Sequence, residues 1–202
     1  MKLVTGGAGY LGSFIARALL ARGERVRILD VRRTKYVPEH AEMIEADVRD
    51  AAACNAAASG TDTVVHTAFV QSFSRLPEAE QRAIDLDGTR NILEAARAAG
   101  ARSVVHASTI EIYGTAPPCP CPEDAPVDPV GLYGQLKWEC EQVIRGFHAR
   151  TGYPVAMMRM PTICGPGFYN HKPLLALLDR ILDGKPVAVI GDGSTAGDFV
   201  HV

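Results

Sequence analysis

Short apolar runs alternate along the chain with longer segments in which apolar residues recur every three or four positions. The short runs predict buried strands at residues 3–5, 26–30, 43–46, 63–68, 103–108 and 155–160. The longer segments predict helices at residues 11–22, 51–58, 79–99 and 132–150. Strands that alternate with helices are typical of a parallel sheet covered on both faces, because each crossover must pack back onto the sheet. We therefore expect an α/β fold built on a doubly wound parallel sheet.

A glycine-rich segment follows the first predicted strand and opens the first predicted helix. It reads Thr5-Gly-Gly-Ala-Gly-Tyr-Leu-Gly12. In this context Gly6 permits a tight turn, Gly9 lets the backbone approach a pyrophosphate, and Gly12 allows the helix to pack closely on the sheet. The helix N-terminus, at Tyr10 and Leu11, then offers free N–H groups to the phosphates. The segment indicates a Rossmann-type dinucleotide site.

Asp30 ends the second predicted strand, where an acidic residue would hold the hydroxyls of the adenosine ribose. A carboxylate there repels a 2′-phosphate, which favours NAD over NADP. Arg32 and Arg33 follow closely and offer that phosphate a cationic partner. The interpretation favours NAD as the cofactor and leaves NADP as the alternative.

Tyr133 and Lys137 are four residues apart in a predicted helix, so both side chains project from one face. An ammonium beside a phenol lowers the pKa of the phenol, which suits a general acid/base. Ser108 and Thr109 end the fifth predicted strand, at the sheet edge where ligands bind. Either hydroxyl is a candidate to hold the substrate oxygen.

The composition excludes several classes of function. The formal net charge is −2 over 202 residues, which gives no electrostatic signature of binding to nucleic acid or to an anionic membrane. No run reaches the roughly 18 apolar residues of a membrane span, and the N-terminus does not resemble a secretory signal. The pair Cys119 and Cys121 lacks a matching Cys/His pair at zinc spacing, so no metal site is expected. A cytoplasmic location is expected.

Taken together, the motifs resemble those of the extended short-chain dehydrogenases/reductases, the NAD-dependent epimerase/dehydratase family, over essentially the whole chain. The resemblance rests on residues 5–12, Asp30, Asp47-Val-Arg-Asp50, His66-Thr-Ala68, Thr109 with Tyr113-Gly114, Tyr133 with Lys137, Arg159-x-Pro161, Gly165-Pro-Gly167 and Gly191-Asp-Gly193.

The resemblance implies a role for each matching residue. The side chain of Asp47 and the backbone of Val48 would contact adenine, and Thr67 and Ala68 would line the nicotinamide half of NAD. For catalysis it implies Tyr133 as general acid/base, Lys137 as the residue that binds the nicotinamide ribose and tunes the tyrosine, and Thr109 as the residue that orients the substrate.

Departures from the family pattern narrow the reaction. Ile110 stands where sugar-nucleotide dehydratases carry an acid, which disfavours dehydration, although Glu111 follows it. Gly197 replaces an arginine that grips a phosphate, which weakens the case for a nucleotide sugar. Asp85 stands where the family usually has asparagine.

We expect residues 1–160 to form an NAD-binding Rossmann domain and 161–202 to begin a substrate-binding part that is apparently truncated, because family members continue beyond this point. A small-molecule substrate is expected, as is a homodimer that pairs through the helices at 79–99 and 132–150. The leading function is an NAD-dependent epimerase or oxidoreductase acting on a sugar-like hydroxyl. The alternatives are a dehydrogenase or reductase of a non-nucleotide alcohol or ketone, and a non-catalytic NAD-binding regulator.

Overall fold

The computed structural model describes residues 1–167, 172–188, 192–193 and 197–202. The chain divides into two compact units, Met1–Met160 and Pro161–Val202. The second unit contains strands β7 (Thr162–Cys164) and β8 (Phe199–His201), which pair in parallel, and helix α6 (Lys172–Leu182). None of these three elements was predicted. Gly191 of the Gly-Asp-Gly motif lies outside the described residues.

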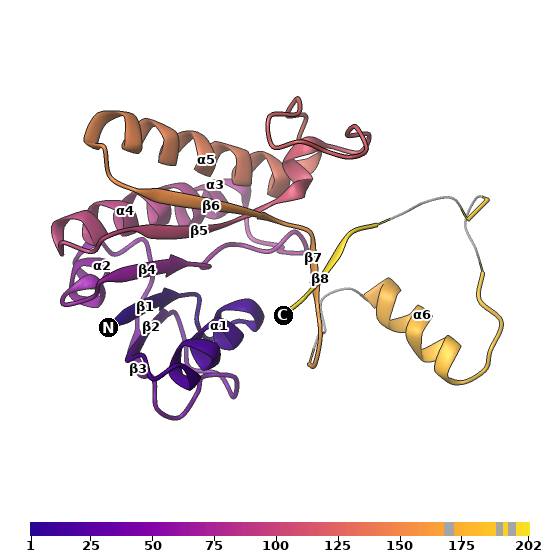
Figure 1. Cartoon of the computed structure of the whole chain (residues 1–202), viewed down its shortest axis with the longest axis horizontal. Coiled ribbons are helices and arrows are strands. Elements are labelled where there is room, and N and C mark those ends of the chain that lie inside the picture. The colour runs from indigo at the N-terminus through magenta and orange to yellow at the C-terminus, as the bar shows by residue number, and fades with distance from the viewer. Residues whose placement is uncertain (168–171, 189–191, 194–196) are drawn as a thin grey trace. The chain divides into compact units, whose positions relative to one another are not determined.

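The first unit is built on a six-stranded parallel sheet with the order β3-β2-β1-β4-β5-β6, which is the Rossmann order (Figure 1). This confirms the predicted doubly wound sheet. The strands are β1 (Lys2–Thr5), β2 (Val26–Asp30), β3 (Glu42–Glu45), β4 (Thr63–His66), β5 (Val104–Thr109) and β6 (Val155–Met160).

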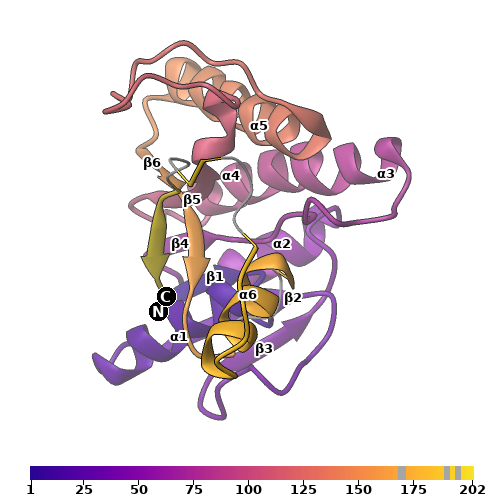
Figure 2. The same cartoon turned by 90° about the vertical axis from the view of Figure 1, so that its right-hand side faces the viewer.

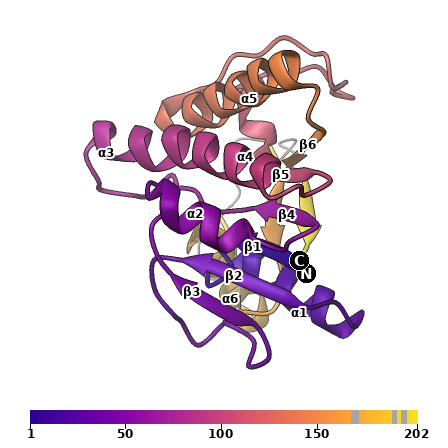
Figure 3. The same cartoon turned by 90° about the vertical axis from the view of Figure 1, so that its left-hand side faces the viewer.

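Helices cover both faces of this sheet, with α1 on one side and α2, α4 and α5 on the other (Figure 3). Side chains alternate between the two faces along each strand, so each strand contributes to both hydrophobic cores. Leu3 and Leu29 pack on one side of the sheet, and Val4 and Ile28 pack on the other. The helical elements of the unit are α1 (Tyr10–Ala21), α2 (Ala51–Ala58), α3 (Glu78–Arg82), η1 (Ala83–Asp87), α4 (Gly88–Ala98), η2 (Ile110–Tyr113) and α5 (Gly131–Thr151).

The predicted helix at residues 79–99 has an irregularity that the pattern did not reveal. Its middle turn, η1, is π-helical and separates α3 from α4. A π-helical turn holds one extra residue and frequently marks a functional site. Asp85 is the buried residue of this turn.

Two further predictions bear on the position of the site. The strand predicted at 63–68 ends at His66, so Thr67 and Ala68 belong to the loop that follows it. The proline-rich segment 117–129 contains neither helix nor strand, as predicted, and runs beside α5 (Figure 2).

Candidate active site

The carboxyl ends of β1 and β4 lie side by side at the point where the strand order reverses. Thr5 at the end of β1 is in register with His66 at the end of β4. The chain leaves β1 through Gly6 and leaves β4 through Thr67. Open α/β sheets bind their ligands at such a switch point, so this edge is where a cofactor site is expected.

The glycine loop forms a cradle of backbone at this edge. Gly6 has a φ of 68°, and a Cβ atom there would lie 2.6 Å from the Ala68 nitrogen. A Cβ atom at Gly12 would collide with the Gly6 carbonyl oxygen. Gly9 is the N-cap of α1 and supplies no side chain to cap the helix, whose first residues are Tyr10 and Leu11. Uncapped N–H groups at a side-chain-free turn fit a pyrophosphate.

Asp30, the last residue of β2, is joined to this loop. Its carboxylate accepts hydrogen bonds from the backbone nitrogens of Ala8 at 3.0 Å and Val31 at 2.8 Å. Burial raises the pKa of Asp30, although these backbone hydrogen bonds oppose the change. Arg32 and Arg33 are both exposed. The acidic side chain is therefore fixed beside the glycine loop, as a ribose-binding residue must be.

Asp47 and Val48 follow β3. Arg49 binds both carboxylate oxygens of Asp47, and this contact lowers the pKa of Asp47. The Val48 carbonyl already accepts hydrogen bonds from Asn91 at 3.0 Å and from the Cys54 thiol at 3.3 Å. Hydrogen bonds thus hold both residues in place. Because the Val48 carbonyl already accepts two hydrogen bonds, the backbone of Val48 would contact adenine through its N–H group.

Thr67 and Ala68 are tied to the end of β1. The Thr67 hydroxyl donates to the Thr5 carbonyl at 2.7 Å, and the Ala68 nitrogen donates to the Thr5 hydroxyl at 3.4 Å. These bonds hold the Ala68 backbone against Gly6. The residues predicted to line the nicotinamide half therefore lie next to the glycine cradle.

Tyr133 and Lys137, from the first turns of α5, meet the same loop after β4. The Lys137 ammonium donates to the Ala107 carbonyl at 2.6 Å and lies 3.5 Å from the centre of the Phe69 ring. Phe69 also packs edge-on against Tyr133, with ring centres 5.6 Å apart. Burial lowers the pKa of Lys137 to about 8. The predicted pair is thus assembled, with Phe69 as a neighbour that the motif does not reveal.

The pKa of Tyr133 moves in the direction opposite to our prediction. Lys137 was expected to lower it, but burial raises it, and the negative charges of Glu111 and Asp85 raise it further. The Thr109 side chain opposes this change only in part. The physical reason is that a buried phenolate loses its solvation, and the one favourable neighbour, Thr109, does not compensate for that loss.

The two hydroxyls at the end of β5 have different roles. Ser108 is buried and donates to Glu141 at 2.6 Å, so its hydroxyl is committed to the interior. Thr109 instead caps η2 by accepting from the Glu111 nitrogen at 3.2 Å, and it lies within reach of Tyr133. Of the two candidates left open by the sequence, Thr109 is the one placed beside the tyrosine.

A buried ion pair supports this end of β5. Glu141, which is fully buried, binds Arg159 through both carboxylate oxygens at 3.0 and 2.7 Å. Arg159 also donates to the Tyr113 hydroxyl and to the Glu123 carbonyl of the proline-rich loop. The ion pair therefore joins β6, α5 and this loop. Arg159 was noted only as part of a motif, and Glu141 carried no sequence signal.

Two histidines are buried below the site. The Thr5 hydroxyl lies 2.6 Å from His66 Nδ1, and His66 Nε2 lies 3.2 Å from the Thr89 hydroxyl. Burial lowers the pKa of His66 to about 3 and holds that of His106 well below its usual value. Both rings are therefore neutral, so they contribute no cation to the site.

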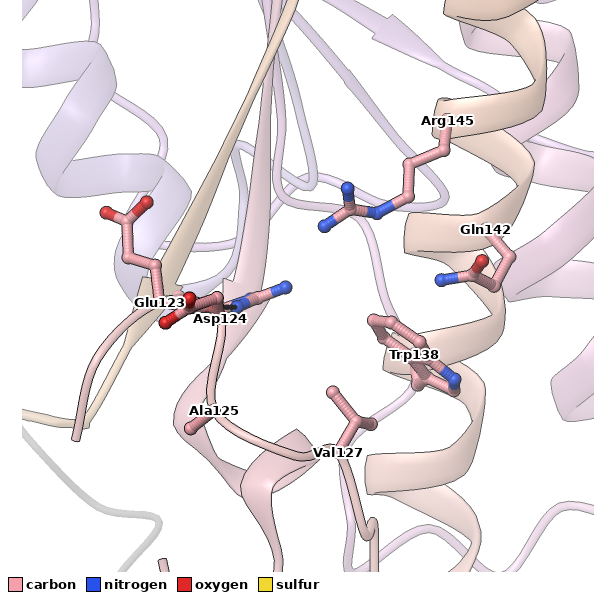
Figure 4. Close-up of a pocket in the computed structure, with 8 residues that line it drawn as sticks. Glu123, Asp124, Ala125, Val127, Trp138, Gln142 and Arg145 are labelled. Atoms are coloured by element: carbon pink, nitrogen blue, oxygen red, sulfur yellow. Dashed lines mark hydrogen bonds between the residues drawn. The ribbon is translucent and has the colours of Figure 1, made fainter. Parts of the chain in front are cut away.

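A hollow of about 580 Å³ lies elsewhere in the first unit, between α5 and the proline-rich loop (Figure 4). Its lining includes neither Tyr133 nor Lys137; the lining residues are Glu123, Asp124, Ala125, Val127, Trp138, Gln142, Arg145 and Arg159. This hollow is therefore separate from Tyr133 and Lys137 at the sheet edge.

In the described part of the chain, no helix is both long and apolar enough to cross a bilayer. The same residues contain no cluster of three or more His, Cys, Asp or Glu side chains arranged to hold a metal ion.

Comparison with known proteins points to one family. The family model described as "NAD dependent epimerase/dehydratase family" matches residues 2–202. A UDP-glucose 4-epimerase from Corynebacterium glutamicum is 33% identical over 220 residues, covering 99% of this chain and 67% of that protein.

Solved structures agree on the fold. A UDP-glucose 4-epimerase from Thermotoga maritima, crystallised with UDP-glucose, has a TM-score of 0.86 at 24% identity, covering 99% of this chain and 69% of that one. The Bordetella bronchiseptica enzyme WbmG in complex with NAD and UDP has a TM-score of 0.81 at 26% identity, covering 99% and 64%. The chain spans about half to two thirds of the curated relatives that it matches.

Proposed function

Because the chain belongs to the NAD-dependent epimerase/dehydratase family, we propose that it binds NAD at the carboxyl edge of the sheet. We further propose that the whole protein moves a hydride to and from a hydroxyl-bearing carbon of a sugar-like substrate. One observation carries the proposal: Phe69, which follows the Ala68 that packs on Gly6, contacts both Tyr133 and Lys137. Cofactor cradle and acid/base pair thus share one edge.

The residues divide the chemistry between them. NAD, when bound, supplies the hydride acceptor, while the protein supplies orientation and proton handling. Burial raises the pKa of Tyr133, so its phenol must first release its own proton to solvent. The phenolate oxygen then takes the proton from the substrate hydroxyl and later returns it. Thr109, whose side chain acts on the pKa of Tyr133, would hold the substrate oxygen in line. Lys137, fixed by the Ala107 carbonyl, would hold the nicotinamide ribose, and its positive charge would act against the burial that raises the pKa of Tyr133.

We propose NAD rather than NADP, because the fixed carboxylate of Asp30 beside the glycine loop suits ribose hydroxyls and repels a phosphate. A homodimer that pairs through α4 and α5, and a cytoplasmic location, complete the proposal.

For the substrate, the relatives favour a nucleotide sugar, since they include a UDP-glucose 4-epimerase. Ile110 in place of an acid disfavours dehydration and leaves epimerisation or oxidation. A second candidate, a non-nucleotide alcohol or ketone, is favoured by Gly197, which offers no cation to a diphosphate.

The test uses the full-length protein with NAD, and UDP-glucose and UDP-N-acetylglucosamine as probes. Tyr133→Phe should lower turnover by about 10²–10⁴-fold, as for loss of a general acid/base. Its NAD affinity should be nearly unchanged, because the ring still packs on Phe69. Tyr36→Phe is the matched control, since Tyr36 lies in the loop between β2 and β3. Equal turnover in wild type and Tyr133→Phe would refute the mechanism.

A further inference from the structure

Asp85 is a buried acid that the proposed mechanism does not use. It lies in the π-helical turn η1 and is 1% exposed. Its Oδ1 accepts a hydrogen bond from the Val70 nitrogen at 2.9 Å, and its carbonyl accepts from the Thr89 hydroxyl at 2.6 Å and from the Cys140 thiol at 3.3 Å. Side chain and backbone are therefore fixed from three elements.

The other oxygen of this carboxyl group has no partner. Among the described residues, Asp85 Oδ2 is a buried side-chain oxygen without a hydrogen bond. A buried polar atom in that state costs free energy, so its presence calls for an explanation. Asp85 thus points to an interaction that the hydrogen bonds do not account for.

The ammonium of Lys137 lacks an acidic partner among the residues that the structure describes. Its ammonium has three donors, of which one binds the Ala107 carbonyl and another faces the Phe69 ring. It forms no ion pair with any residue that the structure describes. Asp85 bonds to Val70, which follows Phe69, and to Cys140, which is nearly one turn beyond Lys137 on α5. The two unmatched charges therefore flank the same small region.

Apart from Glu111, which is exposed, the remaining charged and titratable groups around this region are already neutral or paired. On α5, Glu141 is bound by Arg159, and burial raises the pKa of the Cys140 thiol to about 11. On β4 and β5, His66 and His106 are neutral. Tyr133 is likewise protonated, and Glu111 on η2 acts on Tyr133. Asp85 is the carboxylate left to balance the lysine.

We propose that Asp85 is the counter-charge that keeps Lys137 an ammonium inside this buried site, and that it is thereby a positioning residue for the reaction. The role in catalysis rests on the proposed function, whereas the coupling of the two charges does not. Where the family usually has asparagine, the aspartate allows the paired state, carboxylate with ammonium, in a window of pH.

The limits of the window follow from the two groups. Burial raises the pKa of Asp85 to about 7, so the carboxylate is present above that pH. Burial lowers the pKa of Lys137 to about 8, so the ammonium is present below that pH. Both charges coexist between these values. Below pH 7 Asp85 is protonated while Lys137 remains an ammonium, so the carboxylate acts on the lysine only above that pH.

The test follows the lysine side chains directly by NMR in the full chain labelled with ¹³C at lysine Cε, without NAD or substrate. Lys137→Met identifies the Lys137 signal by its loss. In Asp85→Asn, which keeps the oxygen that accepts from Val70, the titration midpoint of Lys137 should fall by about one unit. Asp87→Asn is the matched control, because Asp87 lies in the same turn but is exposed and paired with Arg90. In this variant the titration midpoint of Lys137 should equal that of the wild type.

An unchanged Lys137 midpoint in Asp85→Asn would overturn the proposal. If that variant does not fold, the wild type decides, because a coupled Lys137 signal must show a second step near pH 7, where Asp85 titrates. A single-step titration would overturn the proposal equally. Neither measurement needs NAD. A negative result in the lysine titration therefore does not contradict the proposed function, and an absence of NAD binding does not contradict the coupling between Asp85 and Lys137.

Discussion

The ammonium of Lys137 lies 3.5 Å from the centre of the Phe69 ring, closer than to the ring of Tyr133, whose centre is 5.8 Å away. The aromatic ring in closest contact with the ammonium therefore belongs to the loop after β4 rather than to α5, the helix that contains Lys137. Because that loop also contains Thr67 and Ala68, the position of the lysine is coupled to the lining of the cofactor site.

This contact predicts that Phe69→Leu lowers the free energy of unfolding by about 1–2 kcal/mol, because a desolvated cation–π contact is lost while the apolar bulk stays. Urea denaturation measures the change. Phe73→Leu is the matched control, since Phe73 lies in the same loop and is 61% exposed. Equal changes in the two variants would show that the ring contributes only ordinary packing.

The buried pair of Glu141 and Arg159 predicts a large loss of stability when the pair is broken. Glu141→Gln should lower the free energy of unfolding by about 3–5 kcal/mol, the usual cost of breaking a buried pair. Glu94→Gln removes an exposed carboxylate that pairs with Arg97 and should cost less than about 1 kcal/mol. Chemical denaturation of both variants at neutral pH makes the comparison, and similar losses would contradict the assigned role.

The same pair predicts a pH dependence of stability, whose sign follows from the carboxyl group. Burial by itself raises the pKa of Glu141, but hydrogen bonds from Arg159 and Ser108 outweigh it and lower the pKa below 4.5. The stabilisation is therefore present above pH 4.5 and is lost as the pH falls through the lower pKa of the folded state. Glu141→Gln should flatten this acid limb, and an acid limb as steep as in the wild type would exclude Glu141 as its source.

Asp30 predicts the choice of cofactor. NAD should bind more tightly than NADP, and Asp30→Asn should narrow the difference, because the amide no longer repels a 2′-phosphate. The amide oxygen can still accept from Ala8, so the loop should keep its shape. Calorimetric titration with both cofactors makes the measurement. Equal affinities in the wild type would point to Arg32 and Arg33 as phosphate ligands.

The strands and the glycine loop could be predicted because their signals are local. Val26–Asp30 is a short apolar run, and the glycines at positions 6, 9 and 12 lie close together in the sequence. Tyr133 and Lys137 are likewise adjacent on one helix. Features that depend on a single residue, or on two residues four positions apart, can be predicted from the sequence.

The contacts that depend on the tertiary fold could not be predicted. Ser108 and Thr109 look equivalent in sequence, and only the position of Glu141 separates them. Asp85 looks like one more helical acid until the π-helical turn buries it. The raised pKa of Tyr133 depends on burial, which no motif states. In the second unit, β7 and β8 have three residues each, too few for a periodic signal. Helix α6 was missed although its apolar residues recur at helical spacing.

The most direct test of the account is a calorimetric titration of this chain with NAD, in the wild type and in Gly12→Ala. We predict one NAD site per chain in the wild type, and an affinity reduced at least about tenfold in Gly12→Ala, or about 1.4 kcal/mol, because the added Cβ collides with the Gly6 carbonyl and deforms the cradle. Gly146→Ala, where a Cβ meets nothing within 4 Å, should bind NAD as the wild type does. A wild-type chain that binds no NAD, or a Gly12→Ala variant that binds it equally well, would contradict the account.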